Sequence, residues 1–130
     1  MKLPKYHNAD ICKGQILSDN KNKSGIYKWK NMINGKQYIG SSVDLYNRLL
    51  FYFSFSAMEN HLKNNQSYIY NALLKHGHEN FSLTILEYCE PEQCIFAPFR
   101  AVSTHGASVQ IIIYPFWSMS IISYQKLAHQ

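Results

Sequence analysis

Apolar and aromatic residues are concentrated in two short stretches, residues 25–30 and 37–40, with the polar pair Asn34-Gly35 between them. Both stretches are rich in aromatic and β-branched residues, which favour strands. An Asn-Gly pair readily adopts the positive φ values that a tight hairpin turn requires. The pattern therefore predicts two antiparallel strands joined by a turn within residues 31–36.

Two later stretches have the spacing of amphipathic helices. Apolar residues recur one turn apart from Leu45 to Phe53, which predicts a helix over about residues 44–53. Further along, Ser67 is a suitable N-cap and Gly77 a suitable terminator. Apolar residues between them recur at helical spacing, so a second helix is expected there.

Apolar and polar residues alternate over residues 80–89, where Phe81, Leu83 and Ile85 are separated by polar residues. This stretch is predicted to be a third strand. The order strand, strand, helix, helix, strand indicates an α+β fold, with a small three-stranded mixed or antiparallel sheet flanked by helices.

The composition changes at both ends of this patterned region. Residues 1–23 are polar and irregular and are predicted to be a linker, so the folded domain is expected to span residues 24–95. Residues 96–130 form a divergent apolar tail. Its stretch 109–124 is too short and too polar for a membrane span, which leaves a strand pair or a poorly ordered tail as the expectation.

The net charge points to a polyanionic partner. Thirteen Lys and Arg residues against eight Asp and Glu give a formal charge of +5. No acid lies between Asn60 and His78, and the cationic or titratable residues there form a predicted DNA-binding face: Lys63, Lys75 and His76, with His61 and His78 nearby. The alternative is an ordinary solvated helix face.

The cysteines and the N-terminus exclude some classes of protein. Cys12, Cys89 and Cys94 are odd in number and unpatterned, which argues against a disulfide scaffold and against a zinc site. Residues 1–10 lack the apolar or Arg-rich amphipathic pattern of a signal or transit peptide, so none is expected.

The candidate chemistry lies in the predicted hairpin and the helix after it. Tyr27 and Tyr38 are on adjacent strands, so their hydroxyls are expected to converge on one face, although two strand tyrosines can also simply pack. Arg48 and Tyr52 lie one helical turn apart on the same face. A guanidinium suits a phosphate, and a cation beside a tyrosine favours its ionised form.

Gly25-Ile26-Tyr27 and Tyr38-Ile39-Gly40, followed by Arg48 and Tyr52, resemble the signature of the GIY-YIG nuclease family, in its homing (intron-encoded) endonuclease branch. The similarity covers about residues 24–95. It implies a small domain that hydrolyses phosphodiesters of double-stranded DNA with one bound Mg²⁺ and no small-molecule cofactor. It further implies that Tyr27 and Tyr38 handle the water, and that Arg48 and Tyr52 act on the phosphate.

The resemblance fails after Cys89, where the family continues into a helix with a metal-binding glutamate. No acid occurs over residues 96–130, and Glu90 and Glu92 precede the position of that helix. The metal ligands are therefore unknown. A shifted reading frame, an unspliced boundary or a degenerate copy would explain the departure.

Three functions stay open from the sequence: a Mg²⁺-dependent endonuclease, a catalytically dead DNA-binding fragment, and an interaction protein that uses its apolar tail. Membrane association is not expected. The kinship with organelle-encoded homing enzymes and the bias toward Asn, Lys, Ile and Tyr suggest a mitochondrial protein that needs no targeting peptide.

Overall fold

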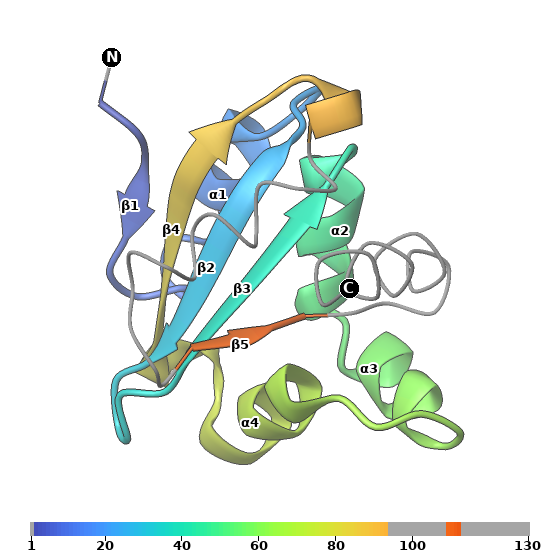
Figure 1. Ribbon diagram of the computed structural model, residues 1–130. Coiled ribbons are helices and arrows are strands. Elements are labelled where there is room, and N and C mark those ends of the chain that lie inside the picture. The colour runs from blue at the N-terminus through green and yellow to red at the C-terminus, as the bar shows by residue number, and fades with distance from the viewer. Residues whose placement is uncertain (1, 94–108, 113–130) are drawn as a thin grey trace.

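The structure, a computed structural model, describes residues 2–93 and 109–112. The elements follow the order β1 (Lys5–Tyr6), α1 (Lys13–Asp19), β2 (Gly25–Asn31), β3 (Gln37–Ser42), α2 (Leu45–Tyr52), α3 (Phe55–Leu62), α4 (Tyr68–His76), the 3₁₀ helix η1 (His78–Asn80), β4 (Phe81–Tyr88), the 3₁₀ helix η2 (Pro91–Gln93) and β5 (Val109–Ile111). Figure 1 shows their arrangement around one sheet.

The sheet has five strands in the order β1-β4-β2-β3-β5. The first three pairs are antiparallel, and β5 runs parallel to β3. The predicted α+β class is confirmed, and the three predicted strands form the centre of the sheet. The sheet was predicted to have three strands because β1 and β5, of two and three residues, are too short to show alternation.

The predicted hairpin is confirmed. The Gly35 amide donates to the Asn31 carbonyl at 2.8 Å, and Gly35 adopts a φ of 77°. A positive φ of this kind is easy for glycine and costly for other residues. The resulting register pairs Tyr27 with Gly40 and Trp29 with Tyr38.

The two predicted helices are confirmed as α2 and α4. The Asp44 carboxylate accepts from the Asn47 amide at 3.1 Å, and the Ser67 hydroxyl accepts from the Tyr70 amide at 3.3 Å. Gly77 follows α4 with a φ of 82°. These contacts satisfy amides that a helix start leaves without an intrahelical partner.

The sequence pattern did not predict α3. This helix also has a serine cap, since the Ser54 hydroxyl accepts from the Ala57 amide at 3.2 Å. Only Met58 is fully buried within it, while Phe55 is exposed. The apolar stripe is therefore too sparse to mark a helix by periodicity.

The prediction that residues 1–23 are a linker was wrong. Lys5 and Tyr6 pair with Thr84 and Leu83 of β4, and Ile16 of α1 is fully buried in the core. A few apolar side chains hold this polar segment to the domain. In the predicted tail, β5 is a strand and pairs with β3. The rest of the tail prediction lies outside the described residues.

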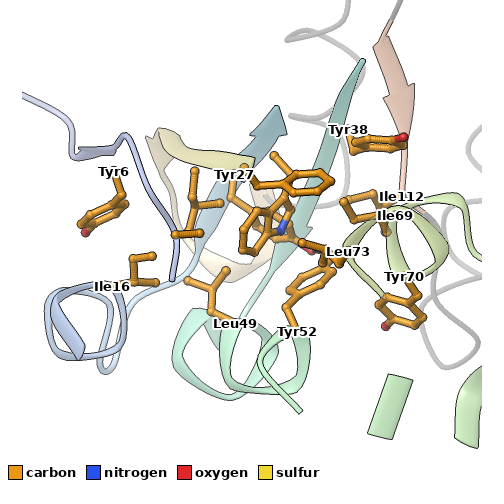
Figure 2. Close-up of a cluster of buried hydrophobic side chains, with 14 of the residues drawn as sticks. Tyr6, Ile16, Tyr27, Tyr38, Leu49, Tyr52, Ile69, Tyr70, Leu73 and Ile112 are labelled. Atoms are coloured by element: carbon orange, nitrogen blue, oxygen red, sulfur yellow. Dashed lines mark hydrogen bonds between the residues drawn. The ribbon is translucent and has the colours of Figure 1, made fainter. Parts of the chain in front are cut away.

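The core is divided by the sheet. Tyr27, Trp29 and Tyr38 point to the face that α1, α2 and α4 cover, and Figure 2 shows several of these side chains together. A smaller cluster around Ile26 and Ile39 occupies the opposite face. Within the described ranges, no helix combines the length and apolar content needed to cross a membrane.

Candidate active site

Both glycines that flank the motif tyrosines are required by close contacts. A Cβ on Gly40 would lie 2.6 Å from the hydroxyl oxygen of Tyr27, because the Tyr27 ring lies over Gly40 on the neighbouring strand. A Cβ on Gly25 would lie 2.3 Å from the carbonyl oxygen of Glu87 in β4. Neither distance is possible for a real Cβ. Gly40 therefore leaves room for the Tyr27 ring, and Gly25 leaves room for the close approach of β4.

Tyr27 and Tyr52 meet at the centre of the site. Their hydroxyl oxygens are 2.8 Å apart, a hydrogen bond in which either oxygen can be the donor. Both side chains are fully buried, and their rings meet edge to face with centroids 5.7 Å apart. Figure 2 shows Tyr52 rising from α2 toward Tyr27 on the sheet.

Arg48 lies one turn before Tyr52 on α2, so the predicted common face is confirmed. Its guanidinium donates to the Tyr70 hydroxyl and lies 4.8 Å from the ring centroid of Tyr52. Only 7% of Arg48 is exposed. Stacking on aromatic rings orients a guanidinium and offsets part of its desolvation. We call Tyr27, Arg48, Tyr52 and Tyr70 the tyrosine–arginine cluster.

Tyr70 of α4 was not among the residues predicted for the site. It lies beside Ile69 and one turn before Leu73, both buried. The sequence pattern placed it in the second predicted helix and gave no sign of its partner. Burial raises the pKa of the Tyr70 hydroxyl, against the opposing effect of the Arg48 charge, so it stays neutral.

His61 of α3 lies next to this cluster and was predicted only as part of a basic face. Its ring centroid is 5.0 Å from that of Tyr70. Burial lowers the pKa of His61, and the positive charge of Arg48 lowers it further. The imidazole is therefore neutral at neutral pH and able to accept a proton.

Tyr38 shares the face of Tyr27 as predicted, but the two hydroxyls do not meet. Among the described residues, no hydrogen bond or ring contact joins Tyr38 to the cluster. It lines a separate cavity of about 200 Å³ with Ile69, Gln110 and Ile112, and Figure 2 places it above Ile112. Burial raises the pKa of Tyr38, so the phenol is neutral at physiological pH.

The residues of the predicted DNA-binding face come from two helices and the segment between them. Lys63 is exposed before α4, whereas Lys75 and His76 lie in its last turn. His78 does not belong to an exposed face, because it is buried and its Nε2 donates to the Tyr52 carbonyl at 2.7 Å.

The described residues do not supply a metal site. No group of three or more His, Cys, Asp or Glu side chains able to hold an ion occurs in residues 2–93 and 109–112. Glu90 and Glu92 are exposed beyond the end of β4. Mg²⁺ is usually bound through one or two carboxylates together with waters and substrate phosphates. The tyrosine–arginine cluster consists of three phenols and a guanidinium, so its donors do not fit this ion.

A mixed sheet whose hairpin carries GIY and YIG, with an arginine positioned from the next helix, defines a nuclease-type α+β domain. A family model, the GIY-YIG catalytic domain, matches residues 23–96. The chain therefore belongs to the GIY-YIG family, as its sequence signature indicated. Nucleases of this family are generally dependent on divalent metals.

Two further comparisons agree. Over 79 residues the chain is 38% identical to "Probable intron-encoded endonuclease 1" of Neurospora crassa. The matched region covers 59% of this chain and 23% of that protein. The match thus spans about a quarter of the relative's length. The catalytic domain of intron endonuclease I-TevI, in a point-mutant form, is similar with a TM-score of 0.50 and 28% identity, over 63% of this chain and 82% of that one.

Proposed function

We propose that this chain is a DNA endonuclease domain, related to intron-encoded homing endonucleases, that hydrolyses phosphodiester bonds. The observation that carries the proposal is the position of Arg48. Its guanidinium is oriented by the Tyr70 hydroxyl and by the ring of Tyr52, which is itself bonded to Tyr27. A fixed, poorly hydrated cation of this kind stabilises charge that develops on a phosphate.

In this mechanism a water oxygen attacks the phosphorus, and the bond from phosphorus to the leaving oxygen breaks. Arg48 offsets the charge on the non-bridging oxygens. The Tyr27 hydroxyl orients the water. The neutral ring of His61, whose centroid lies 5.0 Å from that of Tyr70 at the edge of the cluster, accepts its proton. The leaving oxygen takes a proton from solvent. Tyr38, on β3, stays a predicted second residue that orients the attacking water.

Mg²⁺ is proposed as the metal from family membership alone. A bound divalent ion supplies Lewis-acid stabilisation and activates water in phosphodiester hydrolysis. Because the described residues do not offer its carboxylate ligands, the steps above assign it no position. Retention of nicking in excess EDTA would contradict this part of the proposal.

The test is a plasmid-nicking assay with Mg²⁺. We expect Arg48→Ala to lower the nicking rate by roughly 10²-fold, the usual size of the loss when one transition-state donor is removed. Arg48→Lys keeps the positive charge but loses the planar, two-pronged donor geometry of the guanidinium. It should therefore nick faster than Arg48→Ala but more slowly than the wild type. Leu50→Ala, on the exposed side of α2, is the matched control and should nick like the wild type. Equal nicking by wild type and Arg48→Ala would refute the role of Arg48.

A second candidate is a DNA-binding fragment without catalysis. The observation that favours it is the absence of a carboxylate cluster from the described residues of a chain with a charge of +5. It predicts DNA retention that weakens with salt, without any nicking.

A role for the tail in protein interactions and a mitochondrial, organelle-encoded origin also remain proposals. Sequencing of the encoding transcript and its genome of origin would test the origin.

A further inference from the structure

The sheet face opposite the tyrosine–arginine cluster carries a group of lysines. Side chains alternate along a strand, so Tyr27 and Trp29 point toward the helices and Lys28 and Lys30 point away from them. Lys28 pairs with Ile39, which belongs to the cluster on that opposite face.

The register brings a third lysine into this group. Thr84 of β4 pairs with Lys28 on one side and with Lys5 of β1 on the other, so the three residues form a row across three strands. Two strand spacings put the Cα atoms of Lys5 and Lys28 roughly 10 Å apart, and Lys28 and Lys30 are about 7 Å apart along β2. We call Lys5, Lys28 and Lys30 the lysine face.

The immediate neighbours of the lysine face are uncharged. Lys30 pairs with Ser82 and Gln37, and Lys28 pairs with Thr84 and with the fully buried Ile39. No ion pair joins any of the three lysines to a carboxylate of the described chain. The acid nearest along β4, Glu87, pairs with Ile26, toward the apolar part of this face.

The lysines therefore repel one another. After burial, the charges of Lys30 and Lys5 are the causes that lower the pKa of Lys28. Like charges on neighbouring sheet positions destabilise the fold, and within the described structure no acid offsets this cost. Lys5 is exposed, and Lys28 and Lys30 are half-buried with long stems that allow their ammonium groups to reach solvent.

We propose that the lysine face binds the sugar-phosphate backbone of a segment of duplex DNA other than the one at the tyrosine–arginine cluster. Lysines contact phosphates as point charges, and hydroxyl and amide side chains such as Thr84 and Gln37 donate to phosphate oxygens. The spacing of the lysines covers about two to three phosphates of one strand, which rise 3.4 Å each along the axis.

One feature of this surface favours DNA over an anionic membrane. Ser82, Thr84 and Gln37 pair with the three lysines, and Ile39, the apolar partner of Lys28, is fully buried. A membrane-binding surface instead exposes large apolar side chains beside its cations. The contact is expected to be independent of sequence, because it reaches phosphates and not base edges. The choice of DNA rests on the proposed function, but the surface is separate from the catalytic residues.

The experiment measures binding of the full chain to a labelled duplex of about 30 base pairs by fluorescence anisotropy, from 50 to 300 mM NaCl. The test variant combines Lys5→Gln, Lys28→Gln and Lys30→Gln. The matched control combines Lys21→Gln, Lys23→Gln and Lys36→Gln, which remove the same charge from exposed positions elsewhere. Thermal melts check that both variants fold, and Lys28→Gln alone replaces the test variant if it does not.

We expect the test variant to bind at least about tenfold more weakly at 100 mM NaCl, and its salt slope to fall by roughly 2 to 3, near 0.9 for each lost phosphate contact. For Lys28→Gln alone, the salt slope is expected to fall by about 1. The control variant should change the slope by less than one contact. Equal slopes for the two triple variants would overturn the proposal, since net charge alone would then explain binding.

Two further arms separate the possible failures. Vesicles containing phosphatidylserine test the membrane, and a loss of vesicle binding without a loss of DNA binding would overturn the choice of DNA. Plasmid nicking is measured in parallel. If the wild type never nicks DNA, but the test variant binds DNA more weakly than the control variant, then only the proposed function is contradicted. Nicking that depends on Arg48, with equal binding by both triple variants, contradicts the lysine face alone.

Discussion

Gly40 is the residue over which the ring of Tyr27 lies. In Gly40→Ala the new Cβ would fall within 2.7 Å of two atoms of a fully buried ring. We expect the free energy of unfolding to fall by about 1–3 kcal/mol, the cost of overpacking a core. Urea denaturation measures this effect.

Gly14→Ala in α1 is the matched control, since nothing lies within 4 Å of the position that its new methyl group would take. It should stabilise the protein by about 0.5–1 kcal/mol, because alanine is the better helix former. A Gly40→Ala variant as stable as the wild type would show that Tyr27 can move aside at no cost.

The hydroxyls of Tyr27 and Tyr52 form a buried pair whose energetic coupling can be measured. A double-mutant cycle of Tyr27→Phe and Tyr52→Phe isolates the 2.8 Å hydrogen bond from the packing of the rings. We expect a coupling of about 1 kcal/mol in chemical denaturation, as for a typical intramolecular hydrogen bond. Additive effects of the two substitutions would mean that the pair contributes nothing to stability.

At the level of residues, the sequence predicts what local spacing determines. Arg48 and Tyr52 share a face because they are one helical turn apart, so their proximity follows from the sequence alone. The partnership of Arg48 with Tyr70, and the place of His61 beside it, depend on how α2, α3 and α4 pack. No short-range pattern contains that information.

Among the elements, those with strong local signals were predicted and those without were missed. The hairpin has its Asn-Gly turn, and α2 and α4 have capping residues and an apolar stripe. In α1, by contrast, no side chain caps the start, and Ile16 is its only fully buried residue. Tertiary contact with β4 and α2 stabilises this helix in place of local propensity.

The burial of α1 gives a prediction about this N-terminal element. Ile16→Ala should lower the free energy of unfolding by about 2–5 kcal/mol, because it leaves a cavity in the core. Ile11→Ala is the matched control, since Ile11 is 80% exposed, and its effect should stay within about 0.5 kcal/mol. The comparison is made in urea. Equal small effects would restore the linker interpretation of residues 1–23.

The contact between η1 and the end of α2 should make stability depend on pH. Burial lowers the pKa of His78, and its Nε2 donates to the Tyr52 carbonyl. The unfolded chain protonates this residue below about pH 6.5, while the native state keeps it neutral. The unfolded state then binds more protons, so stability is full above pH 6.5 and falls on acidification, by at most about 1.4 kcal/mol per pH unit.

Urea midpoints at pH 7.5 and 5.5 test this dependence. His78→Gln keeps a donor for the carbonyl but cannot titrate, so its midpoint should change less between the two pH values than that of the wild type. His61 has a pKa lowered in the same direction, and His61→Gln should flatten the dependence further. His7→Gln at an exposed position is the control. An unchanged pH dependence in His78→Gln would exclude His78 as its source.

On the scale of the whole molecule, the sheet separates two surfaces of different chemistry. One face holds the tyrosine–arginine cluster beneath the helices, and the other carries the lysine face and the small cluster around Ile26 and Ile39. The sequence alone predicts this division for the central strands, because alternation assigns each residue to a face. It does not predict that β1 adds Lys5, since a strand of two residues has no readable period.

The parallel edge strand β5 ties a distant part of the chain to this sheet and gives the last prediction. The Ile112 amide donates to the Ile39 carbonyl at 2.8 Å, and only 7% of Ile112 is exposed. Ile112→Ala should therefore lower the free energy of unfolding by about 2–4 kcal/mol. A chain ending at Glu92 lacks the whole strand and should have a melting temperature no higher than that of Ile112→Ala. Gln110→Ala, at an exposed residue of β5, is the control. If the shortened chain melts with the full chain and stays equally soluble, then β5 contributes nothing and residues 2–92 fold alone.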